Sequence, residues 1–204
     1  MKEKNTSRFY DLLLSFSQEP DASERRKIEK IIWGEFGSTK AVLALDMCGF
    51  SELSMKHGIV HYLSMVRRMQ LTVKPIIESY NGSVVKFEAD NCFAIFPHTL
   101  AAIRASITMN STFDASNALN PEDLDIRISC GIDYGEILLV DNKDFFGNPV
   151  IRASKLGEDL AGPGEILVTK KAIEQVDKEE RIKFKPLKLS ISGIEIDVCS
   201  ITTN

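Results

Sequence analysis

Two aspartates, Asp46 and Asp90, lie at the ends of apolar runs, where a side-chain charge can face solvent or a ligand. Asp46 directly follows the apolar run 41–45, and a glycine, Gly49, comes three residues later. Asp90 lies between two apolar runs in VVKFEADNCFAIF, at the spacing of a tight hairpin. Either aspartate alone is compatible with a simple turn or helix-capping role. Together they raise the question of whether the fold brings the two carboxylates to one place.

The surrounding elements predict that it does. The pattern indicates a strand at 41–45, a helix running towards residue 80, strands at 84–88 and 92–96, a helix at 100–113 and a strand at 126–132. This β-α-β-β-α-β order is the ferredoxin-like split unit, in which the first strand lies beside the third. Asp46 and Asp90 should then converge to within about 4–5 Å, where two carboxylates repel unless a divalent cation lies between them. Two-metal phosphoryl-transfer sites are built in this way.

The rest of the chain completes an α+β fold. Gly131 and Gly135 indicate a turn into a strand at 136–140, followed by a helix at 149–160, a strand at 166–168 and a C-terminal β-hairpin from 182–189 and 194–201. We expect a mostly antiparallel sheet with helices on one face. Residues 1–37 predict an N-terminal helical extension, because apolar residues recur there at helical spacing. Residues 38–204 form the expected catalytic domain.

Composition narrows the class of protein. The 204 residues include 29 acidic and 25 basic ones, a balance that argues against a nucleic-acid or anionic-membrane binder. The apolar runs are too short to span a bilayer, and the polar start shows no signal sequence. The four cysteines are widely separated without CxxC spacing, which indicates small buried hydrophobic residues in a reducing compartment. We therefore expect a cytoplasmic domain.

Three segments resemble a known family. LALDMCGFSEL, GSVVKFEADNCFAIF and DFFGNPVIRASKLGEDLAGPGEILV are similar, in order and spacing, to the signature blocks of class III adenylate and guanylate cyclases. The resemblance covers residues 40–176. It implies a nucleotidyl cyclase that converts ATP to 3′,5′-cyclic AMP and pyrophosphate with two Mg²⁺ or Mn²⁺ ions per site.

The resemblance also assigns residues to roles. Asp46 and Asp90 match the two metal-binding aspartates, and the backbone carbonyl of Met47 matches an additional ligand. Lys86 and Asp144 match the pair that reads the purine edge in adenylate cyclases. An ammonium facing N1 and a carboxylate accepting from the 6-amino group select adenine, because guanine reverses the demand at both positions.

The family's active site is shared between two protomers. One protomer supplies the metal ligands and the other supplies base recognition, so the resemblance implies a homodimer with sites at its interface and an inactive lone protomer. The backbone through Gly49 and Phe50 resembles the loop and helix start that cradle the triphosphate.

This sequence departs from the family at three positions. Ile151 stands where the family usually has an asparagine that helps bind the reacting substrate, and Lys155 stands in place of an arginine that stabilises the transition state. Lysine still supplies a positive charge, although without the planar fork of arginine. A strand arginine of the family is Ser129 here, with Arg127 two residues earlier as the candidate catalytic replacement.

Two alternatives stay open at this point. The first is a cyclase with another base preference, for guanine or a pyrimidine. The second is a catalytically weak cyclase-homology module for nucleotide sensing or dimerisation, which the loss of a donor at Ile151 favours and the intact pair Asp46 and Asp90 opposes.

Overall fold

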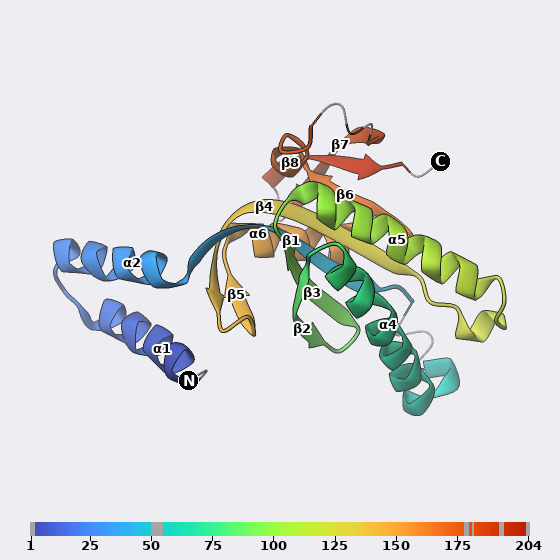
Figure 1. The fold of residues 1–204 in the computed structure, drawn as a ribbon, viewed down its shortest axis with the longest axis horizontal. Helices are drawn as coiled ribbons and strands as arrows, with labels where there is room; N and C mark the ends of the chain where they lie inside the picture. Colours follow the sequence, from blue (N-terminus) through green and yellow to red (C-terminus); the bar gives the residue numbers. More distant parts are fainter. Residues whose placement is uncertain (1–2, 50–54, 178–179, 181, 192–193, 203–204) are drawn as a thin grey trace.

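The computed structural model describes residues 3–49, 55–177, 180, 182–191 and 194–202. It contains an eight-stranded sheet with the order β2-β3-β1-β4-β6-β8-β7, and β5 pairs with β4 beside this path (Figure 1). The strands are β1 Gly37–Met47, β2 Ser83–Glu88, β3 Asn91–Phe96, β4 Ile128–Val140, β5 Asp144–Phe146, β6 Ile166–Thr169, β7 Phe184–Ile191 and β8 Ile194–Ile201. The helices are α1 Glu3–Gln18, α2 Ala22–Phe36, α4 Ile59–Ser79, α5 Thr99–Asn117, α6 Asn148–Ser154 and α7 Lys170–Ile173, with a 3₁₀ turn Glu122–Leu124 and a π-helical segment Lys155–Leu160.

The sheet confirms the expected class. β1 lies between β3 and β4, and every strand pair is antiparallel except β4 with β6. The C-terminal hairpin of β7 and β8 is present as expected. The placement of β1 beside β3 is the feature on which the convergence of Asp46 and Asp90 depends.

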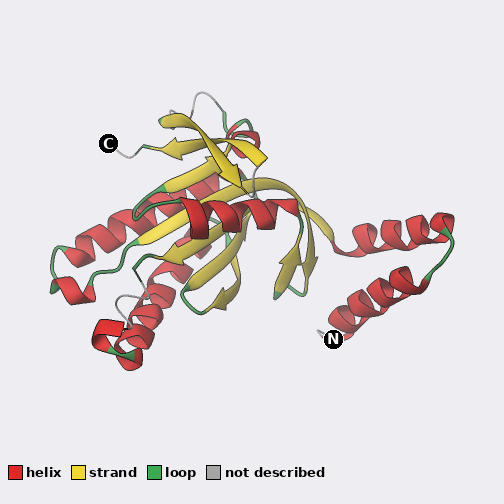
Figure 2. Ribbon diagram, turned by 180° about the vertical axis from the view of Figure 1, so that it is seen from behind, coloured by secondary structure: helices red, strands yellow, loops and turns green. Residues whose placement is uncertain are grey.

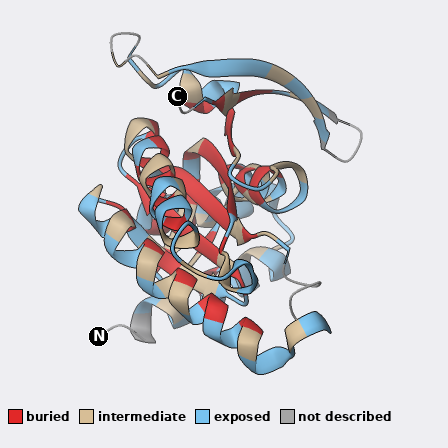
Figure 3. Ribbon diagram, turned by 90° about the vertical axis from the view of Figure 1, so that its right-hand side faces the viewer, coloured by how far each residue is buried: buried red, intermediate tan, exposed pale blue. Residues whose placement is uncertain are grey.

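Helices pack on both faces of the sheet. Leu43 and Leu45 of β1 point into the main core formed with α4 and α5, in front of the sheet in Figure 1. Val42 and Ala44 point the other way and pack in a second core with Ala153 of α6, which crosses the sheet in Figure 2. The expectation of helices on one face is therefore confirmed for the two long helices, while α6 covers the opposite face. Figure 3 shows the buried residues gathered on the central sheet and the inward sides of its helices.

One expected turn is wrong. β4 runs without interruption over 13 residues, through the segment where Gly131 and Gly135 suggested a break. Gly131 is needed for packing instead, because a Cβ at this position would lie 2.1 Å from the carbonyl oxygen of Ala153. Gly157 in the π-helical segment is similarly close to the carbonyl oxygen of Ala44, at 2.5 Å. These two glycines let the α6 layer approach the backbone of β1 and β4.

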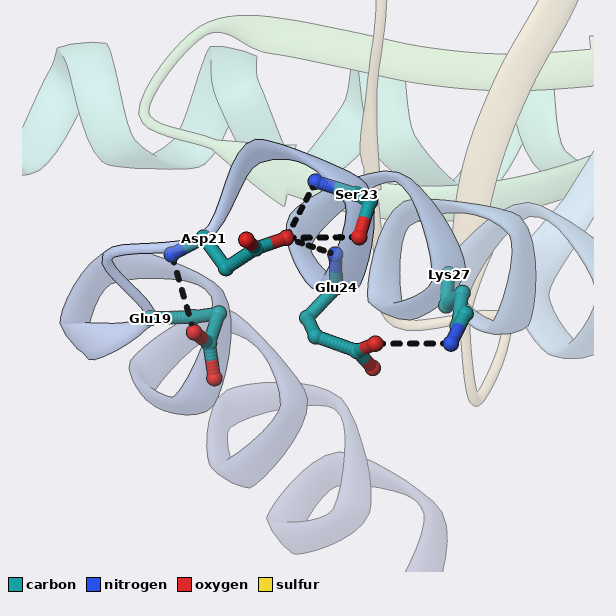
Figure 4. Close-up of polar contacts among 5 residues, drawn as sticks. All are labelled: Glu19, Asp21, Ser23, Glu24 and Lys27. Atoms are coloured by element: carbon teal, nitrogen blue, oxygen red, sulfur yellow. Dashed lines mark hydrogen bonds and ion pairs between the residues drawn. The ribbon is translucent and has the colours of Figure 1, made fainter.

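Residues 1–37, for which the sequence predicts a helical extension, contain α1 and α2, which form an antiparallel pair beside the sheet (Figure 1). Asp21 caps the N-terminus of α2, and its carboxylate accepts the backbone N–H of Ser23 at 2.7 Å and of Glu24 at 3.1 Å (Figure 4). The Ser23 side chain and these N–H groups hold the pKa of Asp21 below its ordinary value. Such a cap satisfies donors that the first helical turn cannot pair.

Candidate active site

The two aspartates lie at the same edge of the sheet. Asp46 is the penultimate residue of β1, and Asp90 lies in the turn between β2 and β3. The antiparallel register places Leu45 of β1 opposite Cys92 of β3. Asp46 and Asp90 therefore lie on the same side of this residue pair, one and two positions from it along the chain. Asp90 is buried, with 9% of its surface exposed, and Asp46 is half-buried. The end of β1 and the β2–β3 turn thus lie at one edge of the sheet, as the topology predicted.

The charges of these aspartates interact. Burial above all, together with the nearby carboxylates of Asp90 and Glu158, raises the pKa of Asp46 to about 7, although the backbone N–H of Met47 lowers it. A carboxylate in this condition binds a proton or a cation readily near neutral pH. The site is therefore prepared for positive charge.

Two residues of this site escaped the sequence analysis. Tyr62 on α4 is buried, and burial together with the nearby Asp90 carboxylate raises the pKa of the phenol. Glu158 lies in the π-helical segment on the other face of the sheet, and burial raises its pKa as well. Both reach the aspartates through tertiary packing, and neither stands near them in sequence.

Lys86 and Asp144 form an ion pair between separate strands. The Nζ atom of Lys86 on β2 lies 3.2 Å from Oδ1 of Asp144, the first residue of β5, and 3.3 Å from Oε1 of Glu88. Burial lowers the pKa of Lys86, but the hydrogen bonds to Asp144 and Glu88 outweigh it and hold the pKa above its ordinary value. The ammonium also lies 5.6 Å from the ring centroid of Phe93. The structure thus brings together the two residues that the resemblance paired.

A β-bulge helps to aim Lys86. The register between β2 and β3 shifts between Val84 and Lys86, and Val85 turns into the second core. Bulges of this kind re-aim side chains next to functional sites. Asp144 is fixed in turn by the backbone N–H of Phe145, which donates to its Oδ1 at 2.9 Å.

The loop after β1 borders an open cavity. The cavity has a volume of about 600 Å³ and is lined by Cys48, Gly49, Lys56, His57, Glu122, Asp123, Asp125 and Arg127. Gly49 has φ 81°, a left-handed conformation that suits glycine. Arg127 precedes β4, is exposed, and lies 3.9 Å from Asp125. Phe50 falls outside the described residues, and Met47, whose side chain is buried, ends β1.

The α6 region and the π-helical segment after it carry two of the three departures from the signature. Ile151 lies in α6 with 60% of its surface exposed, so it is not part of the core. Lys155 opens the π-helical segment and pairs with Asp159, with Nζ 2.6 Å from Oδ2. Ser129 is buried, and its hydroxyl donates to the carbonyl of Gly157 at 2.8 Å. The position of the family's strand arginine is therefore occupied by a contact that holds the π-helical segment.

A buried ion pair that sequence reasoning missed anchors α6. Arg152 Nε lies 2.6 Å from Oδ2 of Asp133, a residue of β4 that is fully buried. The hydroxyl of Thr169, at the end of β6, donates to the other oxygen of Asp133. An isolated aspartate in an apolar strand signals a buried partner, but the sequence does not reveal which cation that partner is.

The donor set at Asp46 and Asp90 fits a divalent cation. Within the described residues, no group of three or more His, Cys, Asp or Glu residues is arranged to hold a metal. Mg²⁺, however, is commonly bound by one or two carboxylates plus substrate phosphates. The buried Oδ1 of Asn91, adjacent to Asp90, also has no hydrogen-bond partner in the part of the chain that is described. Hard oxygen donors with unsatisfied negative charge are what such an ion requires.

Comparison with known proteins gives a consistent picture. No protein-family model matches the chain. It is 27% identical over 144 residues to a putative adenylate cyclase 3 of Rhizobium meliloti, which covers 71% of this chain and 24% of the relative. The chain thus spans about a quarter of that relative's length. It is also 26% identical over 174 residues to an uncharacterised protein of Mycobacterium tuberculosis, and it spans 43% of the length of this second relative.

Solved structures extend the comparison. An adenylate/guanylate cyclase/hydrolase from Silicibacter pomeroyi superposes with a TM-score of 0.67 at 27% identity, covering 82% of this chain and 98% of that one. The adenylyl cyclase CyaB from P. aeruginosa superposes with a TM-score of 0.70 at 19% identity, covering 82% and 96%. Guanylyl cyclase domains match at a similar level. Among the described residues, none of the helices has the length and apolar character needed to cross a membrane.

Proposed function

The chain has the catalytic fold of class III adenylate and guanylate cyclases, and on this premise we propose that it converts ATP to 3′,5′-cyclic AMP and pyrophosphate as a homodimer. The observation that carries the proposal is the Lys86–Asp144 pair, 3.2 Å apart, in a chain that also keeps the converged Asp46 and Asp90. The first pair supplies base recognition and the second supplies the metal ligands.

The reaction is an in-line displacement at phosphorus. The ribose 3′-oxygen forms a bond to the α-phosphorus, the bond from that phosphorus to the bridging oxygen of pyrophosphate breaks, and the 3′-hydroxyl proton passes to solvent water. Asp46, Asp90 and the carbonyl of Met47 would hold two Mg²⁺ or Mn²⁺ ions. When bound, these ions supply charge that lowers the pKa of the 3′-hydroxyl and neutralises the triphosphate.

The remaining residues bind and orient the substrate. Gly49, Phe50 and Arg127 are proposed to hold the triphosphate, since Gly49 and Arg127 line one cavity at the loop that follows β1. Lys155 supplies positive charge to the transition state once its side chain leaves Asp159, and Ile151 borders the substrate without donating a hydrogen bond. The residues of one protomer hold the metal ions, while Lys86 and Asp144 of its partner read the base.

The preference for ATP follows from the chemistry of the base-reading pair. The Lys86 ammonium donates to N1 of adenine, and the Asp144 carboxylate accepts from the 6-amino group. Guanine has a protonated N1 and an O6 acceptor, so both contacts would be lost. The similar structures include adenylyl and guanylyl cyclases, so this preference rests on the two side chains alone.

The cysteines favour a cytoplasmic location. All four cysteines are free, and three are buried, which suits the reducing cytoplasm.

A second candidate function is a weakly catalytic module that binds nucleotide and dimerises. Ile151 favours it, because this residue is exposed at a position where the family has a hydrogen-bond donor. That candidate predicts nucleotide binding with little or no turnover.

The test is incubation of the purified protein with ATP, GTP, CTP or UTP and Mn²⁺ or Mg²⁺, with the products identified by mass. We expect cyclic AMP from the wild type and none from Asp90→Asn. Lys86→Ala should lose preference for ATP, while Lys74→Ala, which removes an exposed helical lysine, serves as the matched control. Absence of any cyclic product from a folded dimer would reject the proposed activity, and full activity of Asp90→Asn would reject the metal assignment.

A further inference from the structure

The N-terminal helices contact the hairpin that carries Asp144. Phe9 of α1 has only 2% of its surface exposed, and its ring stacks on that of Phe146 in β5, with centroids 5.7 Å apart and planes 10° from parallel. The same ring meets Phe36 of α2 edge-on at 5.0 Å. Phe9, Leu12, Ile32, Phe36 and Val140 of β4 form one small core. α1 is thus packed against the β4–β5 hairpin, defined here as residues 138–146.

A hydrogen bond ties α1 to the tip of the same hairpin. The hydroxyl of Thr6 donates to Oδ2 of Asp141. Asp141 and Asn142 both have positive φ values, 52° and 53°, and the N–H of Lys143 donates to the carbonyl of Val140 at 2.9 Å. The hairpin tip is therefore a tight turn, and its Asp141 side chain is held by Thr6 of α1.

Within the β4–β5 hairpin the Asp144 carboxylate is held by the backbone N–H of Phe145, and its ion-pair partner Lys86 lies on β2. β5 has three residues and pairs only with β4 among the described strands. Phe145 turns into the second core and meets Phe93 edge-on at 6.1 Å. Asp144 and Phe146 share the other side of the strand, because side chains alternate along it. A strand this short has low local stability, so external contacts decide how well its side chains are placed.

We propose that α1 is a positioning element for base recognition: through Phe9 and Thr6 it holds the β4–β5 hairpin so that Asp144 meets Lys86. The inference rests on the proposed function, because it gives Asp144 a role in reading the base. Phe9 acts through Phe146 of β5, and Thr6 acts through Asp141 at the tip of the hairpin. A movement of α1 away from the hairpin lowers the precision of the Lys86–Asp144 pair, so the extension is a place where base selection can be adjusted from outside the catalytic domain.

The first experiment measures the hairpin directly. Amide hydrogen exchange at residues 144–146 should become roughly tenfold faster or more in Phe9→Ala and in Thr6→Val, because local opening of the hairpin becomes easier. Leu14→Ala, at a position of the same helix that is 56% exposed, is the matched control and should leave exchange unchanged. Circular dichroism and thermal melting establish that each variant is folded, and Thr6→Val tests the inference if Phe9→Ala is not.

The second experiment measures the consequence for the base. In Phe9→Ala and Thr6→Val the ratio of kcat/KM for ATP to that for GTP should fall on the order of tenfold, since a displacement of about 1 Å can cost up to 10²-fold in rate. A purely structural role of α1 would lower both values equally and leave this ratio unchanged.

The outcomes separate this inference from the proposed function. Faster exchange with a reduced ratio supports it. Unchanged exchange in both folded variants overturns it, and so does faster exchange with an unchanged ratio. If the wild type makes no cyclic nucleotide at all, the proposed function fails, and the exchange arm alone then decides whether α1 holds the hairpin.

Discussion

Replacement of Asp46 by asparagine should stabilise the metal-free protein while it abolishes activity. Asparagine keeps the shape of the side chain and removes a charge that burial and Asp90 oppose. Asp46 has a folded-state pKa of about 7, above the ordinary value of 3.8. The stability it contributes is therefore fully present below pH 3.8 and is lost as the pH rises through about 7.

The size of the effect follows from the same shift. Since one pKa unit corresponds to 1.36 kcal/mol, the difference between 3.8 and about 7 sets an upper limit of about 4 kcal/mol at pH 8. Solvent screening at a half-buried carboxylate reduces this to about 1–3 kcal/mol. For a chain of this length, 2 kcal/mol corresponds to a rise of about 4–8 °C in Tm.

The assay is urea denaturation of the metal-free wild type and of Asp46→Asn between pH 4 and pH 8. The free energies of unfolding should nearly coincide at pH 4 and diverge as the pH rises, with the variant more stable. Asp114→Asn, an exposed change on α5, is the control. Added Mn²⁺ should raise the Tm of the wild type and not that of Asp46→Asn, because binding to the folded state stabilises it.

One result refutes this reasoning. If Asp46→Asn is equally stable or less stable than the wild type at pH 8 without metal, the ionised Asp46 is not opposed by its surroundings. The close approach of Asp46 and Asp90 would then have to be abandoned as the basis of the metal site.

Three further outcomes are expected. Mixed Asp46→Ala and Lys86→Ala protomers should regain activity through heterodimers with one intact site, and a mixture that exchanges chains yet stays inactive contradicts a shared site. Ile151→Asn should raise kcat on the order of 10²-fold with little change in KM, measured by steady-state kinetics, because it restores a donor at an exposed position; an unchanged kcat would show that other groups already fill this role. Arg152→Leu should cost about 3 kcal/mol in urea denaturation, because it leaves Asp133 buried without its cation, and a loss below about 1 kcal/mol would contradict that assignment.

Much of the fold could be predicted from sequence because its signals are local. The apolar periodicity and the turn residues gave the order of elements, and that order alone placed Asp46 beside Asp90. The pairing of Lys86 with Asp144 came from the resemblance, and the structure places them 3.2 Å apart. The roles of these residues in catalysis stay predictions.

The missed features depend on contacts between distant segments. Tyr62 and Glu158 approach Asp46 and Asp90 from α4 and from the π-helical segment, and neither carries a local motif. The continuity of β4 was missed because Gly131 resembles a turn residue, whereas its small size serves the approach of α6. A sequence does not distinguish a glycine that is required because a Cβ would clash from a glycine that is required for a positive φ.

The position of β1 has a consequence for how the chain folds during synthesis. β1 sits between β3 and β4, and its pairs with β4 join residues from 81 positions apart, Met47 with Ile128, to 101 apart, Gly37 with Leu138. The apolar segment of β1 therefore gains one neighbour when β3 has emerged and the second only when most of β4 has been made. Contacts at such separation slow folding and leave an unpaired apolar strand edge in the nascent chain. This unpaired edge of β1 is the point at which a chaperone would bind the growing protein and at which premature aggregation would begin.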